Sequence, residues 1–313
     1  MEAVPSIEKV AAAEGPGSLP TAGHGWVIED LIVNGGDSFR IYTWPAAQVD
    51  TQGAARGALL CLHGAADSGI AWTALATRLA AEPTFEGFTL IAADLRGHGA
   101  TNCKESEDLC ISRLVTDVVQ LADIMSTRHG GAVMLAGHSL GGALAARAAA
   151  QGLRQGLPVR AVLLVEAVEG TAVEGIPRAA AWLRARPLAF PSEDDAVSWA
   201  LSSGMLASEA AARLSMPSRL RWDGSAYVWR SAIAAAESQW QGWFEGLSKL
   251  FAALPLPKLL VVGALDRLDS ALEAAHMQGR FRLEIVAHFG HQIHEDMPKE
   301  VAKAFSRFLA GVE

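Results

Sequence analysis

A serine set among glycines is the residue of this chain that is best suited to nucleophilic chemistry. Ser139 lies in the segment Gly-His-Ser-Leu-Gly-Gly, residues 137–142, between an apolar run and a run of small helix-forming residues. A strand that turns sharply into a helix here would hold the hydroxyl on an exposed bend, and glycines would let the two elements approach closely. A serine hydroxyl is a weak nucleophile until a base activates it. The segment therefore predicts acyl transfer, provided that a base lies nearby.

Histidines near the C-terminus offer that base. His291 follows the last predicted strand and precedes the final helix, in the segment 290–296. This position places it after the serine in the chain order serine, acid, histidine, on the same edge of the predicted sheet. His288 and His294 are neighbouring alternatives. His291 and His294 also have the spacing of a metal-binding pair, but the sequence offers no third ligand cluster, so we expect no metal.

Two carboxylates compete for the role of the acid that orients the histidine. Glu166 follows a predicted strand at 160–165, directly after the strand–helix unit that carries Ser139. Asp266 follows a predicted strand at 258–262. Both residues lie at the carboxyl ends of strands, where ligands bind in a parallel sheet. Their positions alone do not decide which of the two carboxylates orients the histidine.

The transition state of acyl transfer also needs hydrogen-bond donors for the oxyanion. The backbone N–H of Leu140 directly follows the nucleophile and starts a helix, so we expect it to be one donor. The second should come from the loop after His63 and Gly64. We expect Ala65 to supply it, with Ala66 or Asp67 close by.

The elements that must position these residues alternate along the chain. After an N-terminal hairpin at 26–33 and 38–44, apolar strands are predicted at 57–64, 88–93, 132–136, 160–165, 258–262 and 282–286. Helices are predicted at 71–81, 111–128, 270–277 and 298–309. Apolar strands that alternate with helices indicate an α/β fold with a mostly parallel sheet and helices on both faces.

Composition divides the chain into three parts. Residues 1–25 are expected to form a flexible N-terminal arm, and residues 26–169 with 247–313 the α/β core. The segment 170–246 holds six of the nine tryptophans and shows helical patterns without a clear strand. We expect it to be a helical cap, with most tryptophans packing it onto the sheet and one or two lining a substrate groove.

Charge and apolar patterning exclude several classes of function. The chain of 313 residues has a formal net charge of −8 and no long basic run, which argues against nucleic acid as a partner. No run of about 18 apolar residues and no secretory signal is visible, so we expect neither a membrane span nor secretion. Cys61 lies in an apolar strand, and a Cys103–Cys110 bridge is not expected in a cytoplasmic or nuclear protein.

Further segments resemble one family of α/β hydrolases, the protein phosphatase methylesterases. The segments are VEAVEGTA (165–172), RARPLAFPSEDDAVSWALSSG (184–204), YVWRSAIAAAESQWQGWFEGLSKLF (227–251), LPKLLVVGALDRLD (256–269) and MQGRF (277–281). The resemblance implies an α/β-hydrolase fold with Ser139 as nucleophile and His291 as base. It also implies Glu166 as the acid, where the family usually has aspartate, and so favours Glu166 over Asp266.

The same resemblance implies a substrate. These enzymes remove the methyl ester from the C-terminal leucine of the type 2A protein phosphatase catalytic subunit, and they need no cofactor. Some members carry a long acidic insertion before the segment that matches YVWR, but residues 213–226 are short here. Two alternatives remain: a small-molecule carboxylesterase, and a phosphatase-binding protein whose acid, Glu166, marks a weakened triad.

Overall fold

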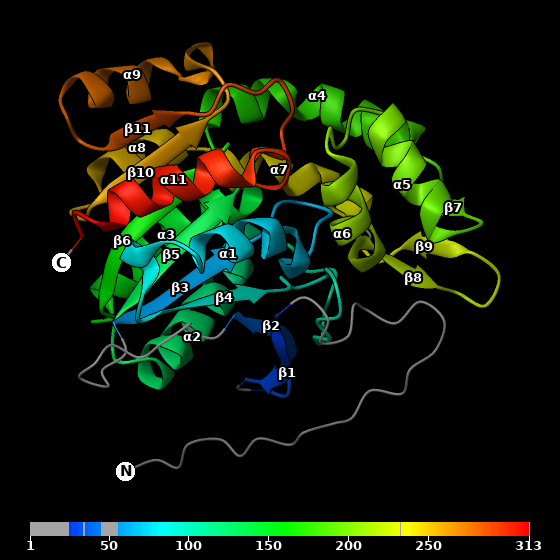
Figure 1. The fold of residues 1–313 in the computed structure, drawn as a ribbon, viewed down its shortest axis with the longest axis horizontal. Helices are drawn as coiled ribbons and strands as arrows, with labels where there is room; N and C mark the ends of the chain where they lie inside the picture. Colours follow the sequence, from blue (N-terminus) through cyan, green and yellow to red (C-terminus); the bar gives the residue numbers. More distant parts are fainter. Residues whose placement is uncertain (1–24, 34, 45–55, 232, 313) are drawn as a thin grey trace.

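An eight-stranded sheet forms the centre of the molecule (Figure 1), in a computed structural model that describes residues 25–33, 35–44, 56–231 and 233–312. The strands lie in the order β1-β2-β4-β3-β5-β6-β10-β11. Their bounds are β1 (Val27–Ile32), β2 (Ser38–Trp44), β3 (Gly57–Leu62), β4 (Phe88–Ala93), β5 (Val133–His138), β6 (Val159–Val165), β10 (Lys258–Val262) and β11 (Arg282–Ile285). All pairs from β4 to β11 are parallel, as the apolar runs predict.

The N-terminal hairpin is also present. β1 and β2 pair antiparallel, with Ile32 opposite Ser38, and β2 pairs antiparallel with β4. Gly35, Gly36 and Asp37 precede β2 in the connection between the strands, while Asn34 lies outside the described residues. Of the predicted arm 1–25, only Gly25 is described.

Helices cover both faces of the sheet (Figure 1). One face carries α1 (Thr73–Leu79) and α11 (Pro298–Leu309), which pack against each other. The other carries α2 (Ile111–Arg128), α3 (Leu140–Arg154), α8 (Leu247–Ala253) and α9 (Ser270–Met277). α3 consists largely of alanine and glycine, and its buried small side chains let it lie close to the sheet. Each face packs against its helices through an apolar core of its own.

The segment between β6 and α8 is not purely helical, which corrects the sequence prediction. Besides α4 (Glu169–Ala185), α5 (Glu193–Ser202), α6 (Glu209–Arg219) and α7 (Trp240–Phe244), it contains β7 (Ala189–Phe190), β8 (Leu220–Trp222) and β9 (Tyr227–Trp229). These strands form a small antiparallel sheet in the order β7-β9-β8. Strands of two or three residues are too short to show an alternating pattern. That is why sequence periodicity missed them.

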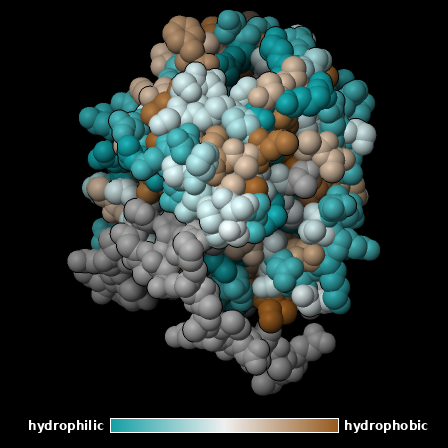
Figure 2. Space-filling view, turned by 90° about the vertical axis from the view of Figure 1, so that its right-hand side faces the viewer, coloured by the Kyte–Doolittle hydropathy of each residue, from teal (hydrophilic) through white to brown (hydrophobic). Residues whose placement is uncertain are grey.

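Five of the six tryptophans of this segment fall into two groups, and Trp222 packs instead against Tyr227. Trp199 packs against Trp182, Phe190 and Trp229, with ring centroids 5.6–5.7 Å apart, around the apolar cluster of α5 and α6. Trp240 and Trp243 are instead buried in the main core with α3 and α8. Figure 2 shows this side of the molecule, where hydrophilic residues cover most of the surface and hydrophobic residues form small groups among them. The tryptophans thus serve mainly to pack the segment, as expected.

All three cysteines are free thiols. Cys61 is buried in β3, Cys103 is buried and Cys110 is partly exposed. Burial raises the pKa of the Cys61 thiol and raises the pKa of Cys103 to about 12, so neither is a ready nucleophile. Within the described ranges, no helix combines the length and the apolar character that crossing a membrane requires.

Candidate active site

Ser139 occupies the bend between β5 and α3. Its backbone has φ 52° and ψ −117°, a left-handed conformation that is strained for a residue with a side chain. Such strain costs on the order of 1–3 kcal/mol and is concentrated at functional sites. The side chain is partly exposed. The N–H of Leu140 is the first of α3, so it has no partner within the helix and is free to serve as a donor.

Close backbone contacts explain the glycines around this bend. A Cβ atom on Gly137 would lie 2.1 Å from the carbonyl oxygen of Gly141, and one on Gly141 would lie 2.1 Å from that of Leu62. A Cβ on Gly64 would meet Nδ1 of His138 at 2.7 Å. Real Cβ contacts are never this short, so these positions exclude any larger residue. The close approach that the motif predicts is present.

His291 lies beside the residue that precedes the serine. The ring centroids of His291 and His138 are 4.6 Å apart, and Nε2 of His138 donates to the carbonyl oxygen of His291 at 2.9 Å. The His291 side chain is about half exposed, at 52%. In the described part of the chain no hydrogen bond joins its ring to Ser139 Oγ. Catalytic hydrogen bonds are often long before substrate binds, so this geometry is compatible with a base.

Glu166 reaches the histidine from the end of β6. Its Oε2 lies 3.6 Å from Nδ1 of His291, and Oε1 accepts a hydrogen bond from the N–H of Gly263 at 2.5 Å. Oε2 also pairs with the guanidinium of Arg267. The carboxylate is almost fully buried, and the backbone of Glu166 has φ 51°, a second strained position at the same edge of the sheet.

Asp266, the alternative acid, occupies a different environment. It belongs to a short 3₁₀ turn, Leu265–Arg267, and its side chain is exposed. No hydrogen bond or ion pair connects Asp266 to His291 among the described residues. The structure therefore brings Glu166, rather than Asp266, next to His291, in agreement with the acid that the resemblance implies.

The other two histidines of the C-terminal segment are engaged elsewhere. Nε2 of His288 pairs with Oδ2 of Asp296 at 3.0 Å. His294 is fully buried, with its ring centroid 4.6 Å from that of Trp72. Burial lowers the pKa of His294 to about 3, so its ring is neutral at physiological pH. A base must exchange protons with the substrate. The half-exposed ring of His291 suits this role better than the ring of His288 or His294 does.

The loop after β3 leaves one backbone donor free. The N–H of Ala66 donates to Nε2 of His98 at 3.1 Å, and that of Asp67 donates to the carbonyl oxygen of Gly64 at 3.3 Å. Ala65 is exposed, and its N–H has no partner in the described ranges. Of the three residues considered from sequence, Ala65 is therefore the one whose N–H remains available to an oxyanion.

Two buried histidines hold this loop in place. Nδ1 of His63 donates to the carbonyl oxygen of Gly64 at 2.7 Å, while its Nε2 accepts the N–H of Leu95 at 2.9 Å. Nδ1 of His98 donates likewise to the carbonyl oxygen of Arg96 at 2.8 Å. Burial lowers the pKa of both rings, which keeps them neutral and able to accept at Nε2. The sequence indicates a structural loop role for His98 but not these contacts, because they join residues that are 32 positions apart.

Asp67, His138 and His294 form the group that most nearly matches a metal site. Their ligand atoms lie within 4.8 Å of one another, and all three residues are buried. However, Oδ1 of Asp67 is already paired with the buried guanidinium of Arg219 at 2.9 Å. This fixed positive charge opposes the binding of a second cation in the same place. We therefore assign no metal to the group.

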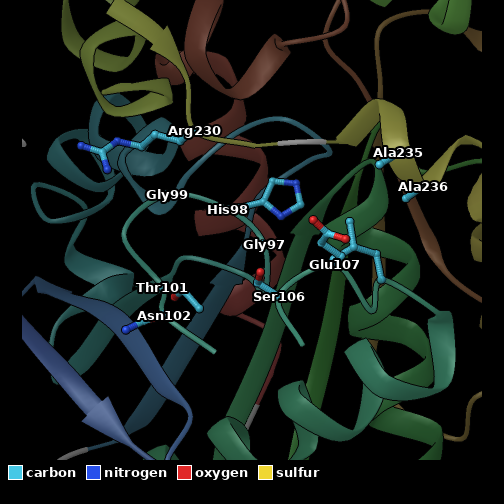
Figure 3. A pocket seen from close by; sticks show the side chains of 11 residues that line it. Gly97, His98, Gly99, Thr101, Asn102, Ser106, Glu107, Arg230, Ala235 and Ala236 are labelled. Carbon is cyan, nitrogen blue, oxygen red and sulfur yellow. The ribbon is translucent and has the colours of Figure 1, made fainter. Parts of the chain in front are cut away.

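His98 also lines a cavity of about 210 Å³. It is lined by Gly97, His98, Gly99, Thr101, Asn102, Ser106, Glu107, Leu109, Arg230, Ala235 and Ala236. Figure 3 shows His98 between the loop that carries Gly97 and Gly99 and the segment that carries Ala235 and Ala236. Neither Ser139 nor any tryptophan lines it. His98 also bonds to Ala66, so it links the cavity to the loop after β3.

The fold and the serine bend define the class of protein. The sequence model of the alpha/beta hydrolase family matches residues 59–304, and this chain is an α/β hydrolase. Within that class it belongs to the protein phosphatase methylesterases. It is 38% identical to the probable protein phosphatase methylesterase 1 of Caenorhabditis elegans, over 79% of this chain and 67% of that protein. It is 32% identical to the mouse protein phosphatase methylesterase 1, over 90% of this chain and 82% of the relative. The resemblance drawn from the sequence is confirmed.

Solved structures share the fold at lower sequence identity. The E-2-(acetamidomethylene)succinate hydrolase superimposes with a TM-score of 0.72 at 19% identity, covering 91% of this chain and all of that one. An esterase of Mycobacterium tuberculosis superimposes with a TM-score of 0.68 at 21% identity, covering 91% and 92%. At such identities the likeness establishes the α/β-hydrolase fold alone.

Proposed function

We propose that this protein is a serine esterase that removes the methyl ester from the C-terminal leucine of the type 2A protein phosphatase catalytic subunit. The proposal is carried by one observation: a serine on a strained strand–helix bend, directly after a histidine that packs against His291, in a chain that belongs to the methylesterase family. A substrate of this kind implies action in the cytoplasm or nucleus. No cofactor is needed for this chemistry.

In the first half of the reaction, Ser139 Oγ attacks the ester carbonyl carbon. Its proton passes to Nε2 of His291, and Glu166 stabilises the resulting imidazolium through Nδ1. The N–H groups of Leu140 and Ala65 hold the negative charge that develops on the carbonyl oxygen. The bond to the methoxy group then breaks, and methanol leaves with the proton from Nε2. The leucyl carboxyl group remains esterified to the serine.

Water completes the reaction. His291 takes a proton from a water molecule, whose oxygen attacks the acyl carbon. The bond to Ser139 Oγ breaks, the serine regains its proton from Nε2, and the phosphatase tail leaves as a carboxylic acid that releases its proton to water. Because methanol is small, the space around the acyl group can be devoted to the peptide tail. We assign the grip on the tail and on the phosphatase surface to the cap segment, residues 170–246.

The test uses methylated phosphatase catalytic subunit as substrate. Wild-type protein should release the methyl group, followed with a methyl-specific antibody, with a kcat/KM far above that for a short nitrophenyl ester. Ser139→Ala should abolish the release and also prevent labelling by a fluorophosphonate probe. Equal or better activity on the nitrophenyl ester would instead favour a small-molecule carboxylesterase. A wild-type protein that binds phosphatase but is not labelled by the probe would favour the non-enzymatic alternative.

A further inference from the structure

One arginine from the segment that we propose as the cap is buried beneath two loops of the candidate site. Arg219 is the last residue of α6, and its side chain has no exposed surface. Its Nη2 lies 2.9 Å from Oδ1 of Asp67 and 2.6 Å from Oε1 of Glu295. Its Nη1 donates to Oγ of Ser215, one turn earlier in the same helix, at 2.7 Å. The guanidinium therefore joins α6 to two segments that are distant from it in sequence.

Both of those segments carry proposed catalytic groups. Asp67 lies two residues after Ala65, in the loop that offers the oxyanion donor, and its side chain is 1% exposed. Glu295 lies four residues after His291, in the short helix α10 (Ile293–Asp296), and its side chain is 2% exposed. Asp67 is thus closer along the chain to the proposed oxyanion donor than Glu295 is to the proposed base.

A second contact fixes the same loop to the same helix. Oγ of Ser68 lies 2.6 Å from Oγ of Ser218, and both residues are fully buried. Asp67 also closes the loop locally, because its Oδ1 accepts the N–H of Ser68 at 2.8 Å. Two consecutive residues of the loop thus contact two consecutive residues of α6.

One guanidinium faces two acidic side chains at this junction, and all three groups are buried. Burial, aided by the charge of Asp67, raises the pKa of Glu295 to about 8, so this side chain is mostly protonated at pH 7. Burial alone would lower the pKa of Arg219, but the charges of Asp67 and Glu295 raise it above the usual value, so the side chain stays charged. Without this charge, Asp67 would be a buried carboxylate with no counterion in a site of low dielectric constant. Movement of its loop toward water would relieve that cost.

We propose that Arg219 is a positioning residue, which holds the N–H of Ala65 in place for the oxyanion by anchoring Asp67. The inference rests on the proposed function, because it takes Ala65 as an oxyanion donor. An oxyanion donor contributes mainly to the transition state, so its displacement lowers kcat rather than raising KM.

The test measures the second-order rate of fluorophosphonate labelling at Ser139, together with kcat and KM for a short nitrophenyl ester. Neither substrate requires the phosphatase. Arg219→Lys keeps the charge but reaches one carboxylate instead of two. We expect it to reduce the labelling rate and kcat about tenfold, since complete loss of an oxyanion donor costs roughly 10²–10³. KM should stay within about twofold.

A second variant guards against a simple loss of folding. Asp67→Asn keeps the size of the side chain and should give a similar decrease in kcat. If both residues act through one contact, the double variant should be no slower than the slower single variant. Arg213→Lys is the matched control, because Arg213 lies on the same helix with exposed ion pairs to Asp194 and Glu209. Its kcat should equal that of wild type.

Three results would overturn the proposal. Arg219→Lys could lower the melting temperature while leaving kcat unchanged at 25 °C, which would mark a purely structural role. The double variant could show additive losses, which would separate Arg219 from Asp67. The acid limb of the kcat/KM profile against pH could shift, which would mean action through Glu295 on the His291 segment. If the probe labels the wild-type protein but the protein does not demethylate the phosphatase, only the proposed substrate is rejected. The comparison of the Arg219 and Asp67 variants still holds.

Discussion

Oε2 of Glu166 lies 3.6 Å from Nδ1 of His291 and also contacts the guanidinium of Arg267. The same carboxylate oxygen thus faces a permanent cation and the ring that must become a cation during the reaction. A hydrogen bond requires a shorter distance. Formation of the imidazolium would strengthen the attraction to Glu166, so we expect this contact to shorten as the reaction proceeds.

The assignment of the acid can be tested with two amide variants. Glu166→Gln removes the negative charge beside His291 and should reduce kcat by about 10³ or more, because the imidazolium loses its partner. Asp266→Asn changes an exposed residue and should reduce kcat less than twofold. Both are measured with a nitrophenyl ester and with methylated phosphatase. The opposite ranking would transfer the acid to Asp266.

The glycines around Ser139 give a prediction on stability. Gly141→Ala would bring a methyl group to 2.1 Å from the carbonyl oxygen of Leu62, which cannot move without the sheet. We expect a loss of about 3 kcal/mol or more in the free energy of unfolding, measured with urea. Gly175→Ala is the control, since a Cβ there meets nothing within 4 Å on helix α4. It should be neutral or stabilise by up to about 1 kcal/mol. Equal losses in the two variants would contradict this account of the bend.

Buried neutral histidines predict a loss of stability in mild acid. Burial, aided by the charge of Arg219, lowers the pKa of His294 from 6.5 to about 3 in the folded protein. The free energy of unfolding that depends on this neutral ring is at its full value above pH 6.5. It falls as the pH falls, because the unfolded chain then binds a proton that the folded chain cannot. By linkage this amounts to about 2 kcal/mol at pH 5.

Urea unfolding at pH 7 and pH 5 measures this effect. His294→Phe should reduce the difference between the two pH values by about 2 kcal/mol, since neither ring nitrogen of His294 has a hydrogen-bond partner in the described structure. His276→Gln changes an exposed histidine of α9 and should leave the difference unchanged. If the His294 variant keeps the wild-type difference, burial does not hold that ring neutral.

A buried ion pair behind the cavity wall gives a further prediction. Arg96 has no exposed side-chain surface and pairs with Asp37 at 2.5 Å and Asp117 at 2.7 Å. Arg96→Met leaves two buried carboxylates with only the partly exposed Arg113 as a charged partner, and it should cost about 3–5 kcal/mol in the free energy of unfolding. Arg213→Met removes an exposed pair on α6 and should cost less than about 1 kcal/mol. A small change for Arg96→Met would mean that Arg113 or water compensates for the lost guanidinium.

The sequence predicted the parallel sheet because its strands are long apolar runs with clear boundaries. β4, β10, α2, α9 and α11 have the predicted bounds. The predicted helix at 71–81 instead begins with a 3₁₀ turn, Gly69–Trp72, and α1 ends at Leu79. The strand predicted at 132–136 continues to His138, because the bend begins only at Ser139. Boundaries shift where the local pattern changes gradually.

Contacts between distant segments could not be predicted in the same way. Both Glu166 and Asp266 follow a strand, so this position did not show which of them lies next to His291. That depends on where each backbone turns once the strand has ended. Arg219 gave no signal at all, because an arginine at the end of a surface-type helix is expected to face water. Its partner Asp67 belongs to a loop that only the folded chain brings next to it.

The glycine contacts at Gly64, Gly137 and Gly141 also limit how this scaffold can change. No residue larger than glycine fits there, so new specificity has to arise elsewhere, and segment 170–246 offers the space for it. Within that segment, Ser218 and Arg219 are exceptions, because they touch the loop beside the nucleophile. An engineer who exchanged the segment for that of another hydrolase would have to transplant this junction together with residues 67 and 68, or lose turnover along with the old substrate.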